Sequence, residues 1–150
     1  MQQSPEDDWT CPPKNRPHWL PDEASGSELS YLSWGYRWYG STPISPSRHG
    51  GWHYFVSMEG GHDLLIEGRT IRAQPGLVCV THPDCPIGHA DQPNHRCRIL
   101  TWIWRTPPTH SALHPPKGSF LRMQISKPQL RHVETLLANC RQAVAVANER

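Results

Sequence analysis

Short runs of apolar, aromatic and β-branched residues fill the centre of the chain, and turn-forming residues separate them. Four such runs span residues 52–58, 62–67, 70–73 and 77–81. Glycine and proline supply the backbone angles of tight turns, and β-branched and aromatic side chains suit a pleated surface. None of the four runs has the length or the 3.6-residue period of a helix. The pattern therefore predicts short antiparallel strands in a sandwich or barrel.

Two longer strands are predicted on either side of these runs. In residues 28–39, Leu32, Trp34, Tyr36 and Trp38 alternate with Tyr31, Ser33, Gly35, Arg37 and Tyr39. Gly35 is a candidate bulge in that strand. In residues 96–105, one face carries Arg98, Leu100, Trp102 and Trp104, and the other carries Ile99, Thr101 and Ile103. Alternation separates the two faces of each strand, but it does not decide which of them points inward.

A helix is predicted from Ser126 to about Asn148. Ser126 and Gln129 have the spacing of a capping box, and Pro128 suits the first turn. Apolar residues then recur at three- and four-residue spacing, at Leu130, Val133, Leu136, Leu137, Cys140 and Val144. This stripe must be buried, either on the chain's own barrel or against a partner chain.

The composition of the chain narrows the range of possible functions. Charged residues make up 19% of the 150, the net charge is +2, and no basic block indicates a nucleic-acid surface. The 7 tryptophans suggest an aromatic-lined cavity, although any single tryptophan can simply belong to a core. The 5 cysteines show no metal-binding spacing. The chain shows neither a signal peptide nor an 18-residue apolar run, so we expect no membrane contact and a cytoplasmic protein with reduced thiols.

Several turns resemble those of the cupin double-stranded β-helix. They are Met58-Glu59-Gly60-Gly61, Glu67-Gly68-Arg69, Gln74-Pro75-Gly76 and the proline-rich turn that leads to His89. More narrowly, they resemble the N-terminal effector-binding domain of AraC-type transcription regulators. The strand over residues 98–104 resembles the one that closes the barrel there. The resemblance implies a mainly β jelly-roll barrel at 29–106, with an arm at 1–28, a linker at 107–118 and a helical dimerisation segment at 119–150.

The resemblance also defines where a metal would bind. Metal-binding cupins carry His-x-His, then a glutamate, then a later histidine. Counting back from Gly60, the glutamate position falls on His53, the two early histidines fall on Ser47 and His49, and the later one falls on His89. His49, His53 and His89 are therefore candidate ligands for zinc, nickel, iron or manganese. Because one histidine is lost and the glutamate is replaced, we expect no cofactor and keep metal binding as an alternative.

We therefore expect a non-enzymatic sensor that binds a small effector, a sugar or similar polar molecule, in the barrel. The expected ligand-binding residues are Trp34, Trp38, Arg48, His53, Phe55, His82, His89 and Trp102. By the same resemblance Trp102 faces the cavity, with an outer surface under the arm or helix as the alternative. The C-terminal helix would form a homodimer, and DNA would be bound only through a further C-terminal domain that this chain lacks. A metal-dependent cupin dioxygenase or isomerase is the second hypothesis, and a carbohydrate-binding module is the third.

Overall fold

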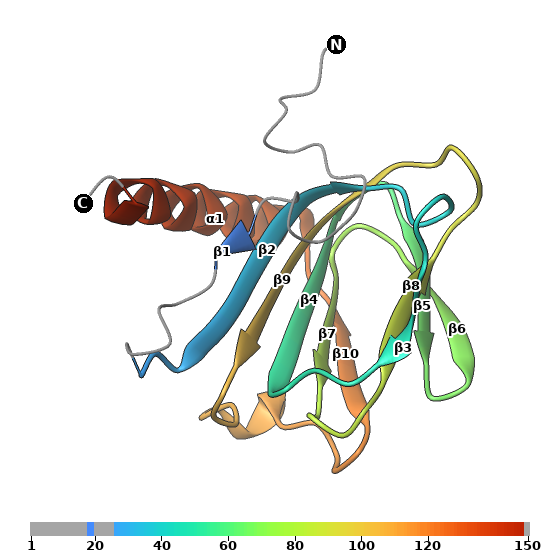
Figure 1. Cartoon of the computed structure of the whole chain (residues 1–150), viewed down its shortest axis with the longest axis horizontal. Coiled ribbons are helices and arrows are strands. Elements are labelled where there is room, and N and C mark those ends of the chain that lie inside the picture. Colours follow the sequence, from blue (N-terminus) through green and yellow to red (C-terminus); the bar gives the residue numbers. More distant parts are fainter. Residues whose placement is uncertain (1–17, 20–25, 149–150) are drawn as a thin grey trace.

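The structure is a computed structural model that describes residues 18–19 and 26–148. The arm predicted over residues 1–28 therefore lies almost wholly outside the described residues. Within them, ten strands form two antiparallel sheets that face one another (Figure 1). In order, the larger sheet contains β1 (His18–Trp19), β2 (Leu29–Arg37), β9 (Cys97–Trp104), β4 (Trp52–Glu59), β7 (Leu77–Thr81) and β10 (Phe120–Gln124). The smaller contains β3 (Ile44–Ser47), β8 (Ile87–Ala90), β5 (His62–Ile66) and β6 (Arg69–Ala73).

The strands pair as a nested set. β5 pairs with β6, β4 with β7, β3 with β8 and β2 with β9. The segment from β2 to β9 therefore forms one long hairpin whose tip is the β5–β6 turn. The hairpin is rolled up, so that successive strand pairs belong alternately to the smaller and the larger sheet. The two residues of that turn, Glu67 and Gly68, have φ angles of 51° and 69°, as the tightest hairpin turns require. This arrangement confirms the predicted double-stranded β-helix.

Four strands were not predicted, and the first of them, β1, falls within the predicted arm. β3 falls in a stretch that reads as a loop, because Pro46 interrupts it and most of it is exposed. β8 falls in the predicted turn after Thr81. β10 corrects the expectation that residues 119–150 are helical, since it pairs in unbroken register with β7 from Phe120 to Gln124. The bulge expected at Gly35 is also misplaced: Gly35 pairs with Ile99, and the register shifts between Leu29 and Tyr31 instead.

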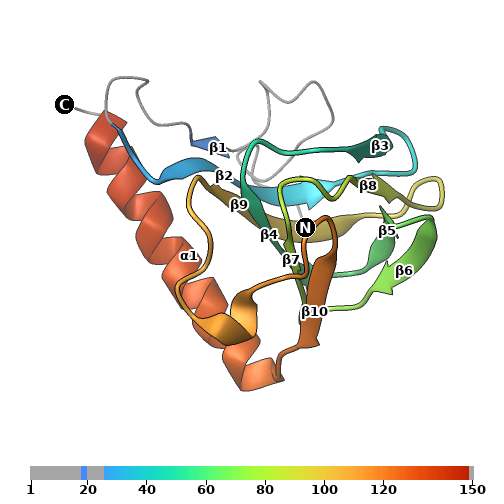
Figure 2. The same cartoon turned by 90° about the horizontal axis from the view of Figure 1, so that it is seen from below.

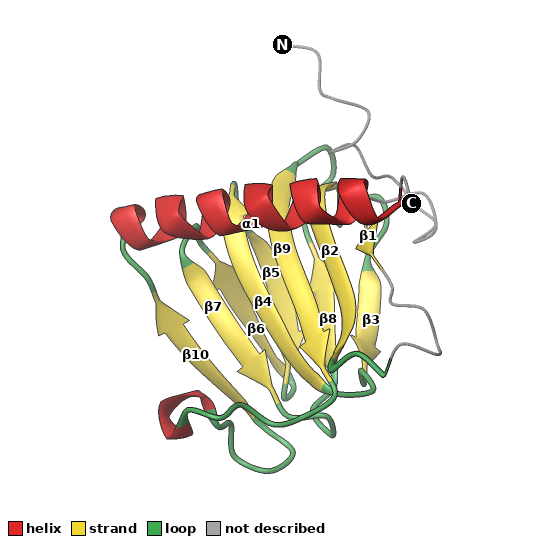
Figure 3. Ribbon diagram, turned by 90° about the vertical axis from the view of Figure 1, so that its left-hand side faces the viewer, coloured by secondary structure: helices red, strands yellow, loops and turns green. Residues whose placement is uncertain are grey.

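The helix α1 (Lys127–Asn148) lies across the outer face of the larger sheet (Figures 2 and 3). A short 3-10 turn at Ser111–Leu113 precedes β10. The predicted capping box is confirmed, because the Ser126 N–H donates to Gln129 Oε1 at 2.7 Å and the Gln129 N–H donates to Ser126 Oγ at 3.3 Å. In the described part of the chain, no helix is long and apolar enough to cross a membrane.

Replacing Ser126 with alanine should lower the free energy of unfolding by about 1 kcal/mol, because the Gln129 N–H loses its acceptor. Ser126→Asp keeps an acceptor at the same place and should lose at most half as much. Urea unfolding followed by circular dichroism measures both variants. Equal losses in the two would contradict the capping role.

Two apolar cores lie on opposite faces of the larger sheet. The inner core lies between the sheets and contains Phe55, Leu64, Ile87 and other residues from both of them. The outer core lies under α1 and joins strand residues to Leu137, with Leu130 and Val133 packed against it. The inner half of the helix stripe is thus buried on the chain's own barrel, which was one of the two alternatives. Leu136, on the other side of the stripe, is 49% exposed.

A charged cluster fastens the helix to the sheet. Arg98 on β9 forms ion pairs with Glu134 on α1 and, at 2.9 Å, with Glu59 on β4. Burial by itself would lower the pKa of Arg98, but its hydrogen bonds to the two carboxylates raise it. The guanidinium therefore stays charged and bridges β4, β9 and α1.

Candidate ligand pocket

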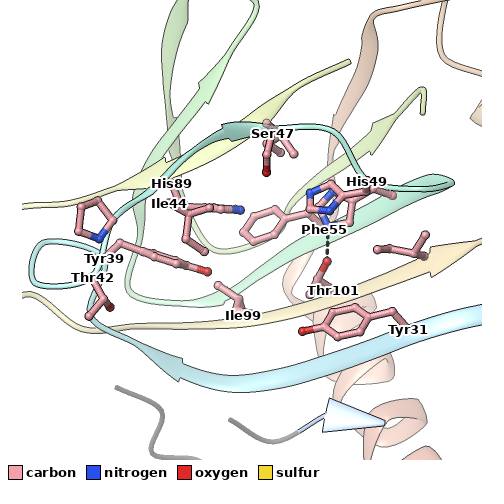
Figure 4. Close-up of a pocket in the computed structure, with 14 residues that line it drawn as sticks. Tyr31, Tyr39, Thr42, Ile44, Ser47, His49, Phe55, His89, Ile99 and Thr101 are labelled. Carbon is pink, nitrogen blue, oxygen red and sulfur yellow. Dashed lines mark hydrogen bonds between the residues drawn. The ribbon is translucent and has the colours of Figure 1, made fainter. Parts of the chain in front are cut away.

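A cavity of about 390 Å³ lies between the two sheets, at the low end of the range for small-molecule sites (Figure 4). None of its described lining residues is an aspartate, glutamate, lysine or arginine. The lining is instead aliphatic, aromatic, hydroxyl and imidazole. It consists of Tyr31, Tyr39, Thr42, Pro43, Ile44, Ser47, His49, His53, Phe55, Ile87, His89, Ile99, Thr101 and Ile103.

The polar groups of the pocket are distributed around it. Figure 4 shows Tyr39, Thr42 and His89 at one end, and His49 and Thr101 at the other. The Phe55 ring lies between them. The lining therefore offers a ligand hydrogen-bonding groups at several places around the Phe55 ring.

Strand alternation explains why these residues line the cavity. On β9, Ile99, Thr101 and Ile103 face inward, so Leu100 and Trp102 face the outer core. On β4, His53 and Phe55 face inward, while Val56 and Met58 belong to the outer core. The predicted division of β9 into two faces is correct, and its aliphatic face is the inner one.

His53 is held at both ring nitrogens. Its Nε2 contacts Thr101 Oγ1, and its Nδ1 lies 3.3 Å from Thr81 Oγ1. Burial lowers the pKa of His53 well below 6.5, and the neighbouring His49 ring, 4.3 Å away between centroids, lowers it further. The ring is therefore neutral near pH 7, so one threonine accepts a hydrogen bond from it and the other donates one to it.

A second histidine pair forms the opposite end of the pocket. His62 Nε2 lies 3.0 Å from His89 Nδ1, and His62 is fully buried behind the lining. The Tyr39 ring stacks on His89 with 4.7 Å between centroids and 14° between planes. Burial lowers the pKa of His62 to about 4, although the nearby Asp91 acts in the opposite direction. His62 is thus a neutral support beneath a lining histidine.

The three expected metal ligands do not converge. His49 and His53 pack against each other at one end, and His89 lies at the other with its Nδ1 facing His62. Across residues 18–19 and 26–148, no group of three or more histidine, cysteine, aspartate or glutamate side chains is arranged to hold a metal ion. Both ring nitrogens of His53 lie within hydrogen-bonding distance of a threonine hydroxyl.

Of the eight expected ligand-binding residues, His53, Phe55 and His89 line the pocket. Trp34 and Trp102 do not: both lie in or against the outer core beneath α1, and Trp102 stacks on Tyr54. The expectation that Trp102 faces the cavity is thus corrected in favour of the outer surface covered by the helix.

The other three expected residues also lie outside the lining: Trp38 is half-buried and Arg48 is exposed. His82 is half-buried, and its Nδ1 accepts the Asp84 N–H at 3.1 Å. Because no described lining residue is a tryptophan, the tryptophan content of the chain does not support a sugar as the ligand of this pocket. Tyr31, Tyr39 and Thr101 were missed, although the first two share one face of their strand pattern.

No known family model matches the chain, and a search of curated proteins finds no match. Solved structures that resemble it include a Cupin 2 conserved barrel domain protein from Salinispora arenicola CNS-205, at 17% identity and TM-score 0.44, over 58% of this chain and 71% of that one. The polyketide cyclase RemF from Streptomyces resistomycificus has 20% identity and TM-score 0.48, over 78% and 77%. Protein Ylba from E. coli has 15% identity and TM-score 0.48, over 72% of this chain and 43% of its own.

The fold is a cupin-type barrel. The nested pairing of β2 to β9 defines it, and the added elements are β1, β10 and α1. In this cupin barrel a hollow lies beside the inner core between the sheets. None of its described lining residues is an aspartate, glutamate, lysine or arginine, and burial lowers the pKa of the lining His53.

Proposed function

We propose that this cupin barrel binds a small molecule without a metal and acts as a sensor rather than as an enzyme. The observation that carries the proposal is the cavity of about 390 Å³ whose described lining contains no aspartate, glutamate, lysine or arginine. His53 is the buried histidine in the position where a cupin would hold metal. Its two nitrogens are already hydrogen-bonded to threonines, which leaves it poorly placed as a ligand or as a general base.

We propose further that the sensor belongs to a transcription regulator of the AraC type. The support is the shared wall between pocket and helix: β2, β4 and β9 line the cavity with one face and carry α1 on the other. A ligand that prefers one arrangement of these strands would also select one position of α1. In this proposal α1 forms a homodimer through its outer side, where Leu136 is 49% exposed, and DNA is bound by a domain outside this chain.

The cytoplasm is the compartment we propose for it. All four cysteines within the described residues, Cys79, Cys85, Cys97 and Cys140, are free. Free thiols are typical of a reducing compartment.

Small-molecule binding without metal is tested by a thermal-shift and tryptophan-fluorescence screen of the purified protein, run with and without a chelator. We expect hits that are unchanged by the chelator, and no metal in stoichiometric amount by elemental analysis. Stoichiometric metal whose removal abolishes binding would overturn the sensor proposal in favour of a metal enzyme.

The dimer is tested by analytical ultracentrifugation over a range of protein concentrations, with and without a hit from the screen. We expect a monomer–dimer equilibrium that the ligand shifts, and Leu136→Glu should move it toward monomer because a charge would be buried at the interface. A monomer at every concentration, with or without ligand, would contradict the dimer.

A further inference from the structure

The hydrocarbon of the pocket lining comes from both sheets. Phe55, Ile87 and Ile99 border the cavity and belong to the inner core, and each is almost fully buried. Ile44 on β3 and Ile103 on β9 also line the cavity, but these two side chains are half-buried. Figure 4 shows Ile44 on a strand of the smaller sheet and Ile99 on a strand of the larger one. A ligand that covers the accessible part of these side chains releases apolar surface from water.

Strand register places each half-buried isoleucine beside a lining histidine. Ile44 is the partner of His89 in the β3–β8 pairing, and Ile103 is the partner of His53 in the β4–β9 pairing. Residues that are directly paired across two strands lie on the same face, with their Cβ atoms about 5 Å apart. A molecule that reaches either histidine therefore also meets an isoleucine.

This arrangement selects against a ligand that is polar on every side. A sugar would place several hydroxyls against hydrocarbon, where a hydroxyl without a hydrogen-bond partner is destabilising. A molecule with a hydrocarbon body instead gains about fourfold in affinity for each methylene group that it buries. The preference depends on the carbon of the lining alone, so it holds for any charge on the lining histidines and for any polar group that the ligand carries.

β3, which carries Ile44, is a weakly held wall of the pocket. Its residues Ile44 and Ser47 are paired with β8, the register shifts between them, and Pro46 has no N–H to donate. Three of its four residues are exposed. Segments with little burial and few protected backbone hydrogen bonds open at low cost in free energy. β3 can therefore adjust to a ligand and pack Ile44 against it.

We propose that the occupant of the pocket carries a hydrocarbon body, aromatic or alicyclic, that lies between Ile44 of the smaller sheet and Ile103 of the larger one. This inference rests on the proposed function, because it names the class of ligand for the same cavity. The body also contacts Phe55 and Ile99, which border the cavity from the inner core. Sugars and other polyols do not match this lining.

The ligand class is tested on the wild-type protein with three matched series of probes. In each series a hydroxymethyl, carboxylate or aminomethyl group carries a methyl, benzyl or 1-naphthylmethyl substituent, as in acetate, phenylacetate and 1-naphthylacetate. D-glucose is the polyol of comparable size. Calorimetric titration gives the affinities, and NMR shifts of the Ile44 and Ile103 methyl groups locate the probe. We expect the affinity to rise about 10-fold or more from the methyl to the benzyl member of at least one series, and D-glucose not to bind.

Two variants test the position of the hydrocarbon body. Ile44→Thr and Ile103→Thr keep a β-branched side chain and exchange carbon for a hydroxyl. Each should weaken the binding of the naphthyl probe about 3-fold or more. Ile71→Thr is the matched control, because Ile71 is a half-buried residue of β6 in the smaller sheet that does not line the cavity. It should leave the affinity unchanged.

Amide hydrogen exchange gives a second readout that needs no variant. A bound naphthyl probe should slow the exchange of the β3 amides, because the ligand holds that strand in place. The β6 amides should not respond, since no residue of β6 lines the cavity. Exchange in β3 that is unchanged on binding would place the hydrocarbon body elsewhere and overturn the inference.

The remaining outcomes separate this inference from the proposed function. D-glucose binding as tightly as the naphthyl probes, or an affinity that does not depend on the hydrocarbon substituent, would overturn the inference and leave the small-molecule pocket standing. Unchanged affinity in folded Ile44→Thr and Ile103→Thr would do the same. Pocket shifts with none of the probes would overturn the proposed function, and this inference with it.

Discussion

The protein should lose stability steeply as the pH falls from about 6.5 toward 4. His62 is fully buried, and burial lowers its pKa to about 4. In the unfolded chain it takes up a proton near pH 6.5, so at intermediate pH the unfolded state binds more protons than the folded one and stability rises with pH. The difference between the two pKa values corresponds to about 3 kcal/mol, fully lost below pH 4. His53, whose pKa is also lowered by burial, adds to the loss.

Urea unfolding at a series of pH values between 7 and 4 measures this dependence. Replacing His62 with asparagine, which cannot titrate, should reduce the slope between pH 6 and 4.5 by up to about 1.4 kcal/mol per pH unit. His132→Asn is the matched control, because His132 is exposed on α1, and it should leave the slope unchanged. A stability that is flat with pH in the wild-type protein would show that these histidines are not buried in the neutral form.

The second large effect concerns the helix. Leu137→Ala should lower the free energy of unfolding by about 2 to 4 kcal/mol, because Leu137 is 7% exposed in the outer core and its removal leaves a cavity. The neighbouring Leu136 offers a matched control with the same chemistry. It is 49% exposed, so Leu136→Ala should change stability by no more than about 0.5 kcal/mol.

Both leucine variants are compared by urea unfolding at low protein concentration, where any dimer is dissociated. Equal losses in the two, or a larger loss at Leu136, would show that α1 presents its other side to the sheet. The two variants therefore show which half of the apolar stripe on α1 packs on the chain's own barrel, a question that the sequence left open.

The sequence predicted the fold better than the pocket. Regular alternation and turn residues identified most of the barrel, and the Ser126 capping box fixed the start of α1. Strand β10 was not predicted, because its five residues follow a proline-rich linker and precede a helix. Only its pairing with β7 identifies it as a strand. The same holds for β3, where Pro46 gives the stretch the composition of a loop.

The prediction of the pocket residues was wrong for a different reason. Alternation shows that Ile99 and Trp102 lie on opposite faces, but the inward face depends on what covers the outward one. The aromatic face of the larger sheet is covered by α1, and so the tryptophans serve as core. A signal for His62 was present: it alternates with Leu64 and Ile66, which places a histidine on the buried face of β5.

The central claim is that the hollow between the sheets is the binding site. Ile103 and Trp102 are adjacent on β9 and face opposite ways, the first into the cavity and the second toward the outer core. Calorimetric titration of a screened ligand into Ile103→Trp and Trp102→Phe is therefore the most direct test. We predict that filling the cavity in Ile103→Trp weakens binding at least 10-fold, while Trp102→Phe binds like the wild type. Unchanged affinity in a folded Ile103→Trp variant would place the ligand elsewhere and contradict the account.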